Sequence, residues 1–327
     1  MNILIANEGI IPVTNYGGTE RVIWYLGKEL VKMGHSITYL VSNGSQCDFA
    51  KVLELDVKKD LNAQIPDHID LVHFNFQPWS TITKPYVITM HGNCNDKRMF
   101  DINTIFVSAN HAERFGSNSF VYNGLDWDDY KKPDVDIKRN YFHFLGNAAW
   151  RIKNVKGAIK IIQQTSKEKL KVLGGNRLNI NMGFRFTISP RISFCGMVGG
   201  EKKLSLLNES KGLVFPVLWN EPFGLALTES LYFGCPVFGT PYGSLPEIVQ
   251  SDVGFLSNNS AALAEQIENG EQFSKQRCQQ YATDIFNSKI MTQKYLEKYE
   301  QVLNGEKLNK TAPQLITVQQ EKFLPFY

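Results

Sequence analysis

Short apolar runs alternate with amphipathic stretches along most of the chain. Near-continuous runs of apolar and β-branched residues predict buried strands. In the first part of the chain these runs are residues 3–7, 36–42, 71–76, 86–91, 104–108 and 119–122. The pattern resumes at residues 141–145, 170–174, 192–195, 212–216, 236–239 and 253–256. Helical spacing of apolar residues predicts helices at 19–33, 155–166, 201–208, 223–233 and 261–269.

Buried strands that alternate with helices are typical of parallel sheets covered on both faces. The alternation occurs twice, and a charged, proline-containing stretch at 126–139 separates the two series. We therefore expect an α/β protein with two doubly wound, Rossmann-like parallel-sheet domains that face a cleft. The N-terminal domain is expected at 1–130 and the C-terminal domain at 131–288. A helix and tail at 289–327 are expected to pack back on the N-terminal domain.

The composition is that of ordinary globular domains. Of the 327 residues, 43% are hydrophobic and 20% are charged, which excludes an intrinsically disordered chain. The N-terminal residues MNILIANEG carry no basic group, and the longest uncharged stretch, residues 230–246, is broken by glycine and proline. Neither a signal peptide nor a membrane-spanning segment is expected, so the expected location is cytoplasmic. Loose association with the inner face of the membrane stays open.

Charge is distributed unevenly along the chain. Residues 131–211 carry 17 Lys and Arg against 5 Asp and Glu, a net charge of +12. Residues 1–130 carry 10 against 15, and residues 212–327 carry 8 against 12. A basic stretch between two acidic ones indicates an anionic ligand, although a solvated lysine-rich face produces the same pattern. Signatures of helix-turn-helix, zinc-finger and aromatic-basic modules are lacking, so no nucleic-acid partner is expected.

Several common catalytic signatures are absent from the sequence: GxxxxGK[ST], GxGxxG after the first strand, HExxH and GxSxG. The triplet Asp126-Trp127-Asp128 offers two carboxylates for a divalent metal. An Asn-Gly pair precedes it, however, and that is typical of a turn. We therefore expect no metal site.

Two features of the N-terminal half are candidates for ligand contacts. Gly17 and Gly18 precede a predicted helix, where backbone amides can approach an anion closely, but a tight turn explains them equally well. His91 ends a predicted strand and is a candidate for contact with substrate hydroxyls. A packing role is the commoner explanation for a single histidine.

The loop after the first strand of the second series combines a glycine with three cations. Gly146 and Asn147 begin it, and Arg151, Lys153 and Lys156 lie within six residues at the start of the next predicted helix. The helix dipole disfavours cations at an N-terminus, and an anionic ligand would remove the conflict. The opposing explanation is that these long side chains extend into solvent.

Residues 211–249 form the most informative segment. A strand of buried type ends at Pro216, and the loop after it presents Glu221 shortly before a predicted helix that carries Glu229. Backbone amides of residues 223–225, at the helix start, can donate to phosphate or sugar oxygens. Two carboxylates eight positions apart can hold two hydroxylated rings on either side of a diphosphate.

At these residues the chain resembles the family-4 (group 1) retaining glycosyltransferases of the GT-B architecture. The resemblance extends from the Gly17-Gly18 loop to a helix that ends near Leu303. Its most specific element is the Glu-x7-Glu block from Glu221 to Glu229. Supporting elements are NGLD at 123–126, GMV at 196–198, the Lys156-Gly157 helix start, GSLPE at 243–247 and residues 252–256.

The resemblance implies a nucleotide-sugar site in the C-terminal domain. Glu229 would accept hydrogen bonds from the ribose. Glu221 and the amides of Phe223, Gly224 and Leu225 would hold the donor sugar. Backbone groups that would meet the base are those of Gly196, Met197 and Val198.

Cations of the glycine loop would neutralise the diphosphate, chiefly Arg151 and Lys156, with Asn147 and Lys153 beside them. The family usually has Gly-Arg directly after this strand, whereas here the arginine comes four residues after Asn147. Which of Arg151, Lys153 and Lys156 binds the diphosphate therefore stays open. Arginines at 177, 185 and 191 either add donor contacts or lie in a surface loop.

In the N-terminal domain, Gly17 and Gly18 would approach the diphosphate or the acceptor, and His91 would lie beside the reacting sugar. The implied enzyme is a retaining, metal-independent hexosyltransferase without a cofactor. It would move a sugar from a UDP-, GDP- or ADP-linked donor to a glycan or lipid-linked acceptor, in cell-envelope polysaccharide or glycoconjugate synthesis. Two alternatives stay open: a catalytically silent GT-B-like subunit that binds a glycan or a partner, and a nucleotide-sugar epimerase of the same fold.

Overall fold

The computed structural model describes residues 1–13, 17–180, 184–269 and 273–327. Within those ranges the chain forms two compact units. Unit 1 comprises residues 1–13, 17–126 and 286–319, and unit 2 comprises residues 127–285 and 320–327. The tail expected at 289–327 on the N-terminal domain is thus divided, because its helix belongs to unit 1 and its last eight residues belong to unit 2.

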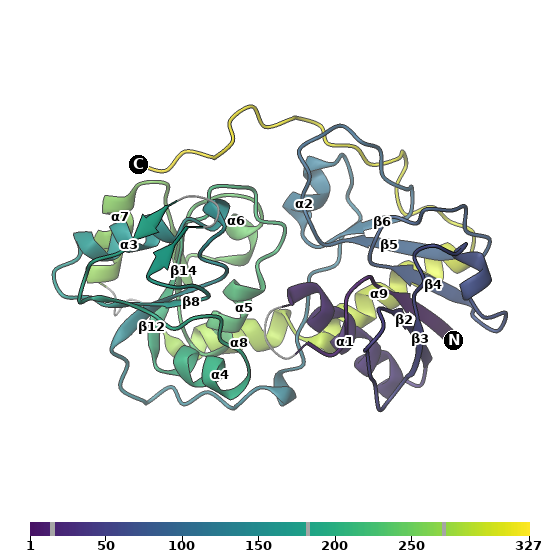
Figure 1. Ribbon diagram of the computed structural model, residues 1–327, viewed down its shortest axis with the longest axis horizontal. Coiled ribbons are helices and arrows are strands. Elements are labelled where there is room, and N and C mark those ends of the chain that lie inside the picture. Colours follow the sequence, from purple (N-terminus) through teal and green to yellow (C-terminus); the bar gives the residue numbers. More distant parts are fainter. Residues whose placement is uncertain (14–16, 181–183, 270–272) are drawn as a thin grey trace. The chain divides into compact units, whose positions relative to one another are not determined.

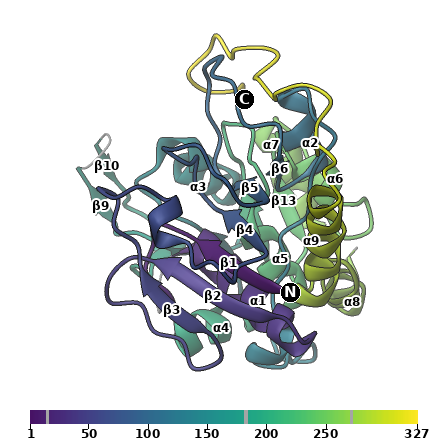
Figure 2. The same ribbon diagram turned by 90° about the vertical axis from the view of Figure 1, so that its right-hand side faces the viewer.

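Unit 1 is built on a six-stranded parallel sheet in the order β3-β2-β1-β4-β5-β6 (Figure 2). Its strands are β1 (Asn2–Ala6), β2 (Ser36–Val41), β3 (Lys51–Glu54), β4 (Leu71–Phe74), β5 (Tyr86–Met90) and β6 (Thr104–Phe106). Ile3 of β1 pairs with Ile37 on one side and Leu71 on the other. Because every pairing is parallel, the carboxyl ends of the strands lie at one edge of the sheet.

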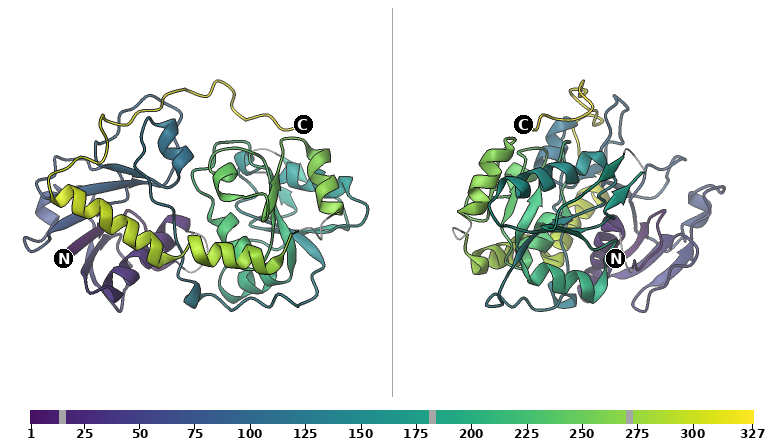
Figure 3. Two further views of the ribbon diagram at one scale, coloured as in Figure 1. Left: turned by 180° about the vertical axis from the view of Figure 1, so that it is seen from behind. Right: turned by 60° about the vertical axis from the view of Figure 1, so that its left-hand side comes forward.

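Helices cover one face of this sheet and a loop covers the other. Helices α1 (Gly18–Lys32) and α9 (Ser288–Leu303) pack against each other and against β2 and β5, and Figure 3 shows α9 in yellow-green along the sheet. On the opposite face, apolar side chains of residues 55–69, around the short helix η1 (Asn62–Gln64), pack on Leu4 and Val72. Helix α2 (Ala109–Arg114) follows β6 and is capped by Ser108.

Unit 2 contains a second six-stranded parallel sheet, in the order β11-β8-β7-β12-β13-β14. Its strands are β7 (Tyr141–Leu145), β8 (Leu170–Leu173), β11 (Ile192–Phe194), β12 (Ser210–Phe215), β13 (Val237–Gly239) and β14 (Gly254–Leu256). A two-stranded antiparallel hairpin, β9 (Leu178–Asn179) and β10 (Arg185–Phe186), stands apart from the sheet.

Helices lie on both faces of this sheet (Figure 1). Helices α3 (Val155–Gln164) and α7 (Ser260–Glu268) enclose one apolar core with Phe144 and Val172. On the other face, α5 (Leu225–Tyr232) packs on β12 and β13 and on α8 (Lys275–Ile285). The remaining helices of unit 2 in the described ranges are α4 (Gly200–Asn208), α6 (Leu245–Ile248), η2 (Trp127–Asp129) and η3 (Arg151–Lys153).

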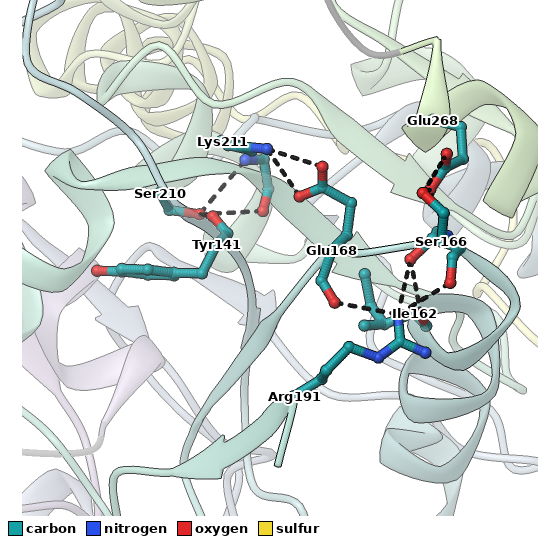
Figure 4. A network of polar contacts seen from close by, with 10 residues as sticks. Tyr141, Ile162, Ser166, Glu168, Arg191, Ser210, Lys211 and Glu268 are labelled. Atoms are coloured by element: carbon teal, nitrogen blue, oxygen red, sulfur yellow. Dashed lines mark hydrogen bonds and ion pairs between the residues drawn. The ribbon is translucent and has the colours of Figure 1, made fainter. Parts of the chain in front are cut away.

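A polar network closes the amino-terminal edge of the second sheet (Figure 4). The guanidinium of Arg191 donates to the carbonyls of Thr165 and Gln163 at 2.9 and 3.1 Å. Lys211 Nζ lies 2.7 Å from a carboxylate oxygen of Glu168. Arg191 therefore holds the chain at the amino-terminal end of the sheet, remote from the carboxyl-terminal loops. The sequence left open whether Arg191 contacts the donor or lies in a surface loop, and its position is far from the expected donor site.

Both sheets have the same doubly wound strand order, with the first strand of each series next to the fourth. The expectation of an α/β protein with two doubly wound parallel sheets is confirmed. In such sheets ligands bind beyond the carboxyl ends of the two central strands. For unit 2 these strands are β7 and β12. None of the helices in the described residues combines the length and apolar character needed to cross a bilayer.

Candidate active site in unit 2

Glycines shape the start of the loop between β7 and α3. Gly146 has φ 152°, and a Cβ on Gly174, after β8, would collide with the carbonyl oxygen of Gly146. Oδ1 of Asn147 accepts a hydrogen bond from the amide of Ala149 at 3.0 Å. Asn147, expected to contact the donor, thus stabilises the turn of this loop with its side-chain oxygen.

Asn154 joins this loop to the loop after β12. It adopts a left-handed conformation with φ 56°, and its Oδ1 caps α3 by accepting from the amide of Gly157 at 2.9 Å. Its Nδ2 donates to the carbonyl of Pro216 at 2.9 Å, and the amide of Leu218 donates to the carbonyl of Ile152 at 2.8 Å. These bonds bring the cation-rich loop and the Glu221 loop together at the switch point of the sheet.

Glu221 and Lys153 form a buried ion pair. Lys153 Nζ lies 2.8 and 2.7 Å from the two carboxylate oxygens, and Trp219 Nε1 donates to one of them at 2.7 Å. Only 10% of the Lys153 side chain and 7% of the Glu221 side chain are exposed. The ammonium also lies over the rings of Phe215 and Trp219, at 5.3 and 5.1 Å from their centroids. Lys153, one of the three cations expected to bind the diphosphate, is thus paired with Glu221, the carboxylate expected to hold the sugar.

The turn between Glu221 and α5 is fixed by close backbone packing. Gly224 has φ 85°, a conformation that glycine adopts without strain, and α5 begins at the next residue. Gly243 packs so closely on Glu221 that a Cβ would collide with its backbone. Ser244 donates from its amide to the carbonyl of Glu221 at 2.9 Å and from its hydroxyl to that of Phe223 at 2.7 Å. The GSLPE element therefore supports the Glu221 loop.

Glu229 lies on α5 and is almost fully buried, with 2% of the residue exposed. Its Oε1 accepts from Lys203 Nζ at 2.6 Å and from the hydroxyl of Tyr130 at 2.8 Å. Lys203 belongs to α4, and Tyr130 follows η2. The sequence places Glu229 on a helix near Glu221, as the structure does, but the partners that hold its carboxylate come from distant segments.

A pocket of about 350 Å³ lies next to the cation-rich loop. Glu221 and Glu229 are not among the residues that line it. Its walls come from that loop, from the β9–β10 hairpin, from the loop after β12 and from the last residues of the chain. They include Trp150, Arg151, Lys156, Phe184, Leu218 and Phe323.

Arg151 and Lys156 are exposed, whereas Lys153 between them is buried. Their exposure and their place in the pocket wall leave Arg151 and Lys156 accessible to an anion from solvent. Arg177 and Arg185, for which donor contacts were an open alternative, are held by hydrogen bonds to residues that flank the hairpin. Arg177 donates to the carbonyl of Thr187 at 2.7 Å, and Arg185 donates to that of Asn176 at 2.8 Å.

The segment expected to meet the base follows β11. Gly196 has φ 72°, and its amide donates to the carbonyl of Gly175 at 3.2 Å. The side chain of Met197 is 51% exposed, and Val198 is half-buried. This loop thus extends from the carboxyl end of the sheet, the same edge that carries the pocket.

The remaining expected residues belong to unit 1. Gly17 precedes Gly18, the first residue of α1, and a Cβ on Gly17 would approach a carboxylate oxygen of Glu20 to 2.8 Å. His91 follows β5 and is half-buried, and its Nε2 donates to Oδ1 of Asn75 at 2.7 Å. Burial lowers the pKa of His91 to about 4, so its ring is neutral at pH 7.

Asp126, the first residue of the Asp-x-Asp triplet, is bound by lysines. Lys28 Nζ and Lys32 Nζ lie 3.0 and 3.1 Å from one of its carboxylate oxygens. Burial opposes ionisation of Asp126, but the hydrogen bonds from both lysines outweigh it and lower the pKa of the carboxyl overall. Across the described residues, no group of three or more His, Cys, Asp or Glu side chains is arranged to hold a metal ion.

Two six-stranded, doubly wound parallel sheets with flanking helices match the architecture of GT-B glycosyltransferases. Residues 139–270, within unit 2, match the family model of glycosyl transferases group 1. The match and the fold are consistent with a group 1 glycosyltransferase and confirm the resemblance found in the sequence. Among curated proteins, no significant match was found.

Several solved structures share the fold. AviGT4, a glycosyltransferase involved in avilamycin A biosynthesis, is 18% identical over 93% of this chain and 98% of its own, with a TM-score of 0.75. Sucrose-phosphate synthase from Thermosynechococcus elongatus is 15% identical over 93% of this chain and 100% of its own, with a TM-score of 0.72. Anabaena HepE in complex with UDP-glucose is 16% identical over 92% of this chain and 100% of its own, with a TM-score of 0.65.

Sequence patterns did not indicate four residues that the structure places in or beside the site. Lys203 and Tyr130 hold Glu229, Trp219 holds Glu221, and Phe323 lines the pocket. The sequence does carry a signal for Trp219, because it lies two residues before Glu221 in the same loop. The other three come from segments whose position depends on the tertiary fold.

Proposed function

We propose that this protein is a retaining glycosyltransferase that moves a hexose-type sugar from a nucleoside-diphosphate sugar to a glycan or lipid-linked acceptor. We place the reaction in cell-envelope polysaccharide or glycoconjugate synthesis. The observation that carries the proposal is the site in unit 2, where the group 1 family match coincides with a buried Glu221–Lys153 pair and a pocket lined by two exposed cations.

The chemistry of sugar transfer requires stabilisation of a departing diphosphate. Arg151 and Lys156, on the wall of the pocket, supply positive charge for that purpose and do the work that a divalent metal does in other enzymes. We therefore propose that the reaction needs neither a metal nor another cofactor. Lys153 is the less suitable phosphate ligand, because its ammonium already neutralises Glu221.

Glu221 is proposed to accept a hydroxyl of the donor sugar. Its carboxylate accepts three hydrogen bonds, from Lys153 and Trp219, of about four that a carboxylate can take. Glu229 is proposed to bind the ribose. His91 is proposed to contact the reacting sugar as a neutral imidazole, in keeping with its pKa of about 4. Retention at the sugar carbon would follow from departure and attack on one face, so we assign no protein nucleophile.

The direct test is calorimetric titration of the full chain with UDP, GDP, ADP and their common sugar conjugates in the presence of EDTA. We expect one nucleotide to bind and its sugar conjugate to be consumed slowly by hydrolysis or by transfer to an added acceptor. The product anomer, read by NMR, then tests retention. Binding without any turnover would favour a silent subunit, conversion of the donor sugar in place would favour an epimerase, and the lack of any binding would refute the proposal.

A lipid-linked acceptor at a membrane surface is supported by the β9–β10 hairpin. Five large apolar residues in and just after this hairpin are each more than half exposed: Leu178, Ile180, Phe184, Phe186 and Ile188. Exposed apolar groups within a segment of net charge +12 suit the surface of an anionic membrane. The full chain should sediment with phosphatidylglycerol-containing vesicles and less with pure phosphatidylcholine. A variant with Ile180→Ser and Ile188→Ser that sediments as the wild type would contradict this assignment.

A further inference from the structure

The C-terminal segment (residues 320–327) docks on unit 2 although the chain just before it belongs to unit 1. The amide of Leu324 donates to the carbonyl of Leu218 at 2.8 Å, in the loop after β12. The carbonyl of Pro325 accepts from the hydroxyl of Tyr242 at 2.6 Å. Both partners lie in loops at the carboxyl edge of the second sheet.

The last two residues fix the end of the segment beside α7, where Figure 1 marks the C-terminus. Tyr327 donates from its amide to the carbonyl of Asn258 and accepts from the amide of Ser260, at 2.9 and 2.8 Å. Phe326 packs on the apolar core enclosed by α3 and α7, and Lys160 Nζ lies 5.9 Å from the centroid of its ring. Backbone pairing and a half-buried aromatic ring together show that the segment docks specifically.

Phe323 is the residue of the segment that reaches the pocket. The guanidinium carbon of Arg151 lies 4.8 Å from the centroid of the Phe323 ring, and both residues line the pocket together with Leu218. Leu218 is also the residue whose carbonyl anchors the segment. The docking of the C-terminal segment on Leu218 therefore also places the Phe323 ring beside Arg151 in the pocket wall.

A position over an aromatic ring suits an arginine that must bind an anion. The ring attracts the cation and accepts no conventional hydrogen bond from it, so the N–H donors remain available to phosphate oxygens. A long exposed side chain loses rotamer freedom when it binds a ligand, and a side chain already held by a ring loses less. Arg151 is exposed, so without Phe323 it would sample many rotamers in solvent.

We propose that Phe323 is a positioning residue of the nucleotide-sugar site and holds Arg151 over the pocket for the diphosphate of the donor. The inference rests on the proposed function, in which Arg151 binds that diphosphate. It adds that the C-terminal segment is part of the site, and that a protein ending at Gln319 would have a defective pocket although both sheets were complete.

The experiment is a double-mutant cycle in the full chain, with Phe323→Leu, Arg151→Gln and the double variant. The Kd of UDP, GDP and ADP is measured by calorimetry with EDTA present. Phe323→Leu should raise the Kd of the bound nucleotide about three- to tenfold, as loss of a cation–π contact and of preorganisation implies. In the Arg151→Gln background the same change should have little further effect. Phe323→Tyr, which keeps the ring, should restore binding.

Phe326→Leu is the matched control, because it makes the same change three residues along, on the core side of the segment. The thermal midpoint of each variant is measured beside its Kd. If the Kd rises in both variants in proportion to lost thermal stability, Phe323 has only a structural role and the inference is wrong.

Three further results would overturn the inference. A Kd for Phe323→Leu equal to that of the wild type would refute the positioning role while the proposed function stands. An equal rise of the Kd in the wild-type and Arg151→Gln backgrounds would show that Phe323 does not act through Arg151. A wild-type chain that binds none of the three nucleotides would refute the proposed function itself, and this inference with it.

Discussion

Replacing Lys153 by methionine removes the ammonium that balances the buried carboxylate of Glu221 and keeps most of the length of the side chain. Methionine can still pack against the rings of Phe215 and Trp219, which now flank the ammonium. The side chains of the pair are only 10% and 7% exposed, so water cannot replace the lost partner fully. The change therefore isolates the charge from the packing.

Removing one partner of a buried ion pair typically costs about 3–5 kcal/mol, because the other charge stays buried without compensation. For a unit of this size, each kcal/mol lowers the thermal midpoint by about 2–4 °C. Lys153→Met should thus lower the midpoint of unit 2 by about 6–20 °C. The double variant Lys153→Met with Glu221→Leu should recover much of the loss, since it leaves no buried charge.

Differential scanning calorimetry measures the midpoints of the wild type and of both variants. A single variant that melts with the wild type would refute the reasoning, because the carboxylate would then have another source of compensation. A double variant less stable than the single one would refute it too, since packing rather than charge would dominate.

Three further changes test the site and the fold. Glu229→Gln should weaken nucleotide binding by about 1–3 kcal/mol through lost charged hydrogen bonds, as calorimetry can measure, and unchanged affinity would exclude Glu229 from the ribose site. Lys156→Gln should raise the Kd of the nucleoside diphosphate more than Lys169→Gln, which removes an exposed lysine just before β8. Equal effects of the two changes would show that Lys156 acts only through the overall charge of the protein and does not contact the nucleotide. Burial lowers the pKa of His143 and His73 to about 3, below their ordinary 6.5, so below pH 6.5 the unfolded chain binds more protons than the native one. Stability should decrease as the pH falls through that range, by about 1.4 kcal/mol per unit for each histidine, and urea unfolding with equal stability at pH 7 and pH 5 would contradict this.

The apolar runs predicted the two sheets well because parallel strands buried on both faces leave a strong pattern. Elements with a weaker apolar pattern were not predicted. Strand β3 lies at the edge of its sheet and reads KVLE, with partly exposed side chains. Helix α8 is largely polar and buries only Cys278 and Ala282. The expected strand at 119–122 is reduced to a bridge between Phe106 and Phe120. Such elements depend on what packs against them, which local sequence does not encode.

Pairings between distant residues limited the prediction of the site in a different way. The motif Glu-x7-Glu places two carboxylates near each other, but it says nothing of their partners. Lys153 is 68 positions from Glu221, and Lys203 is 26 positions from Glu229. Both lysines are buried because a carboxylate is buried with them, and such a coupling appears only when the strands are assembled.

Residues 131–211 carry a net charge of +12, but not all of their cations can contact a ligand directly. Lys153, Lys203 and Lys211 are paired with carboxylates, and the guanidinium groups of Arg177 and Arg191 donate to backbone carbonyls. Carbonyl bonds fix these arginines but leave their charge, so they still contribute to a field that attracts anions to unit 2. Close contact is a separate matter, because it requires an exposed cation at a pocket. On the proposed function, the segment would have two electrostatic roles: many cations would attract the diphosphate from a distance, and a few would bind it. Raised ionic strength should weaken the first role more than the second.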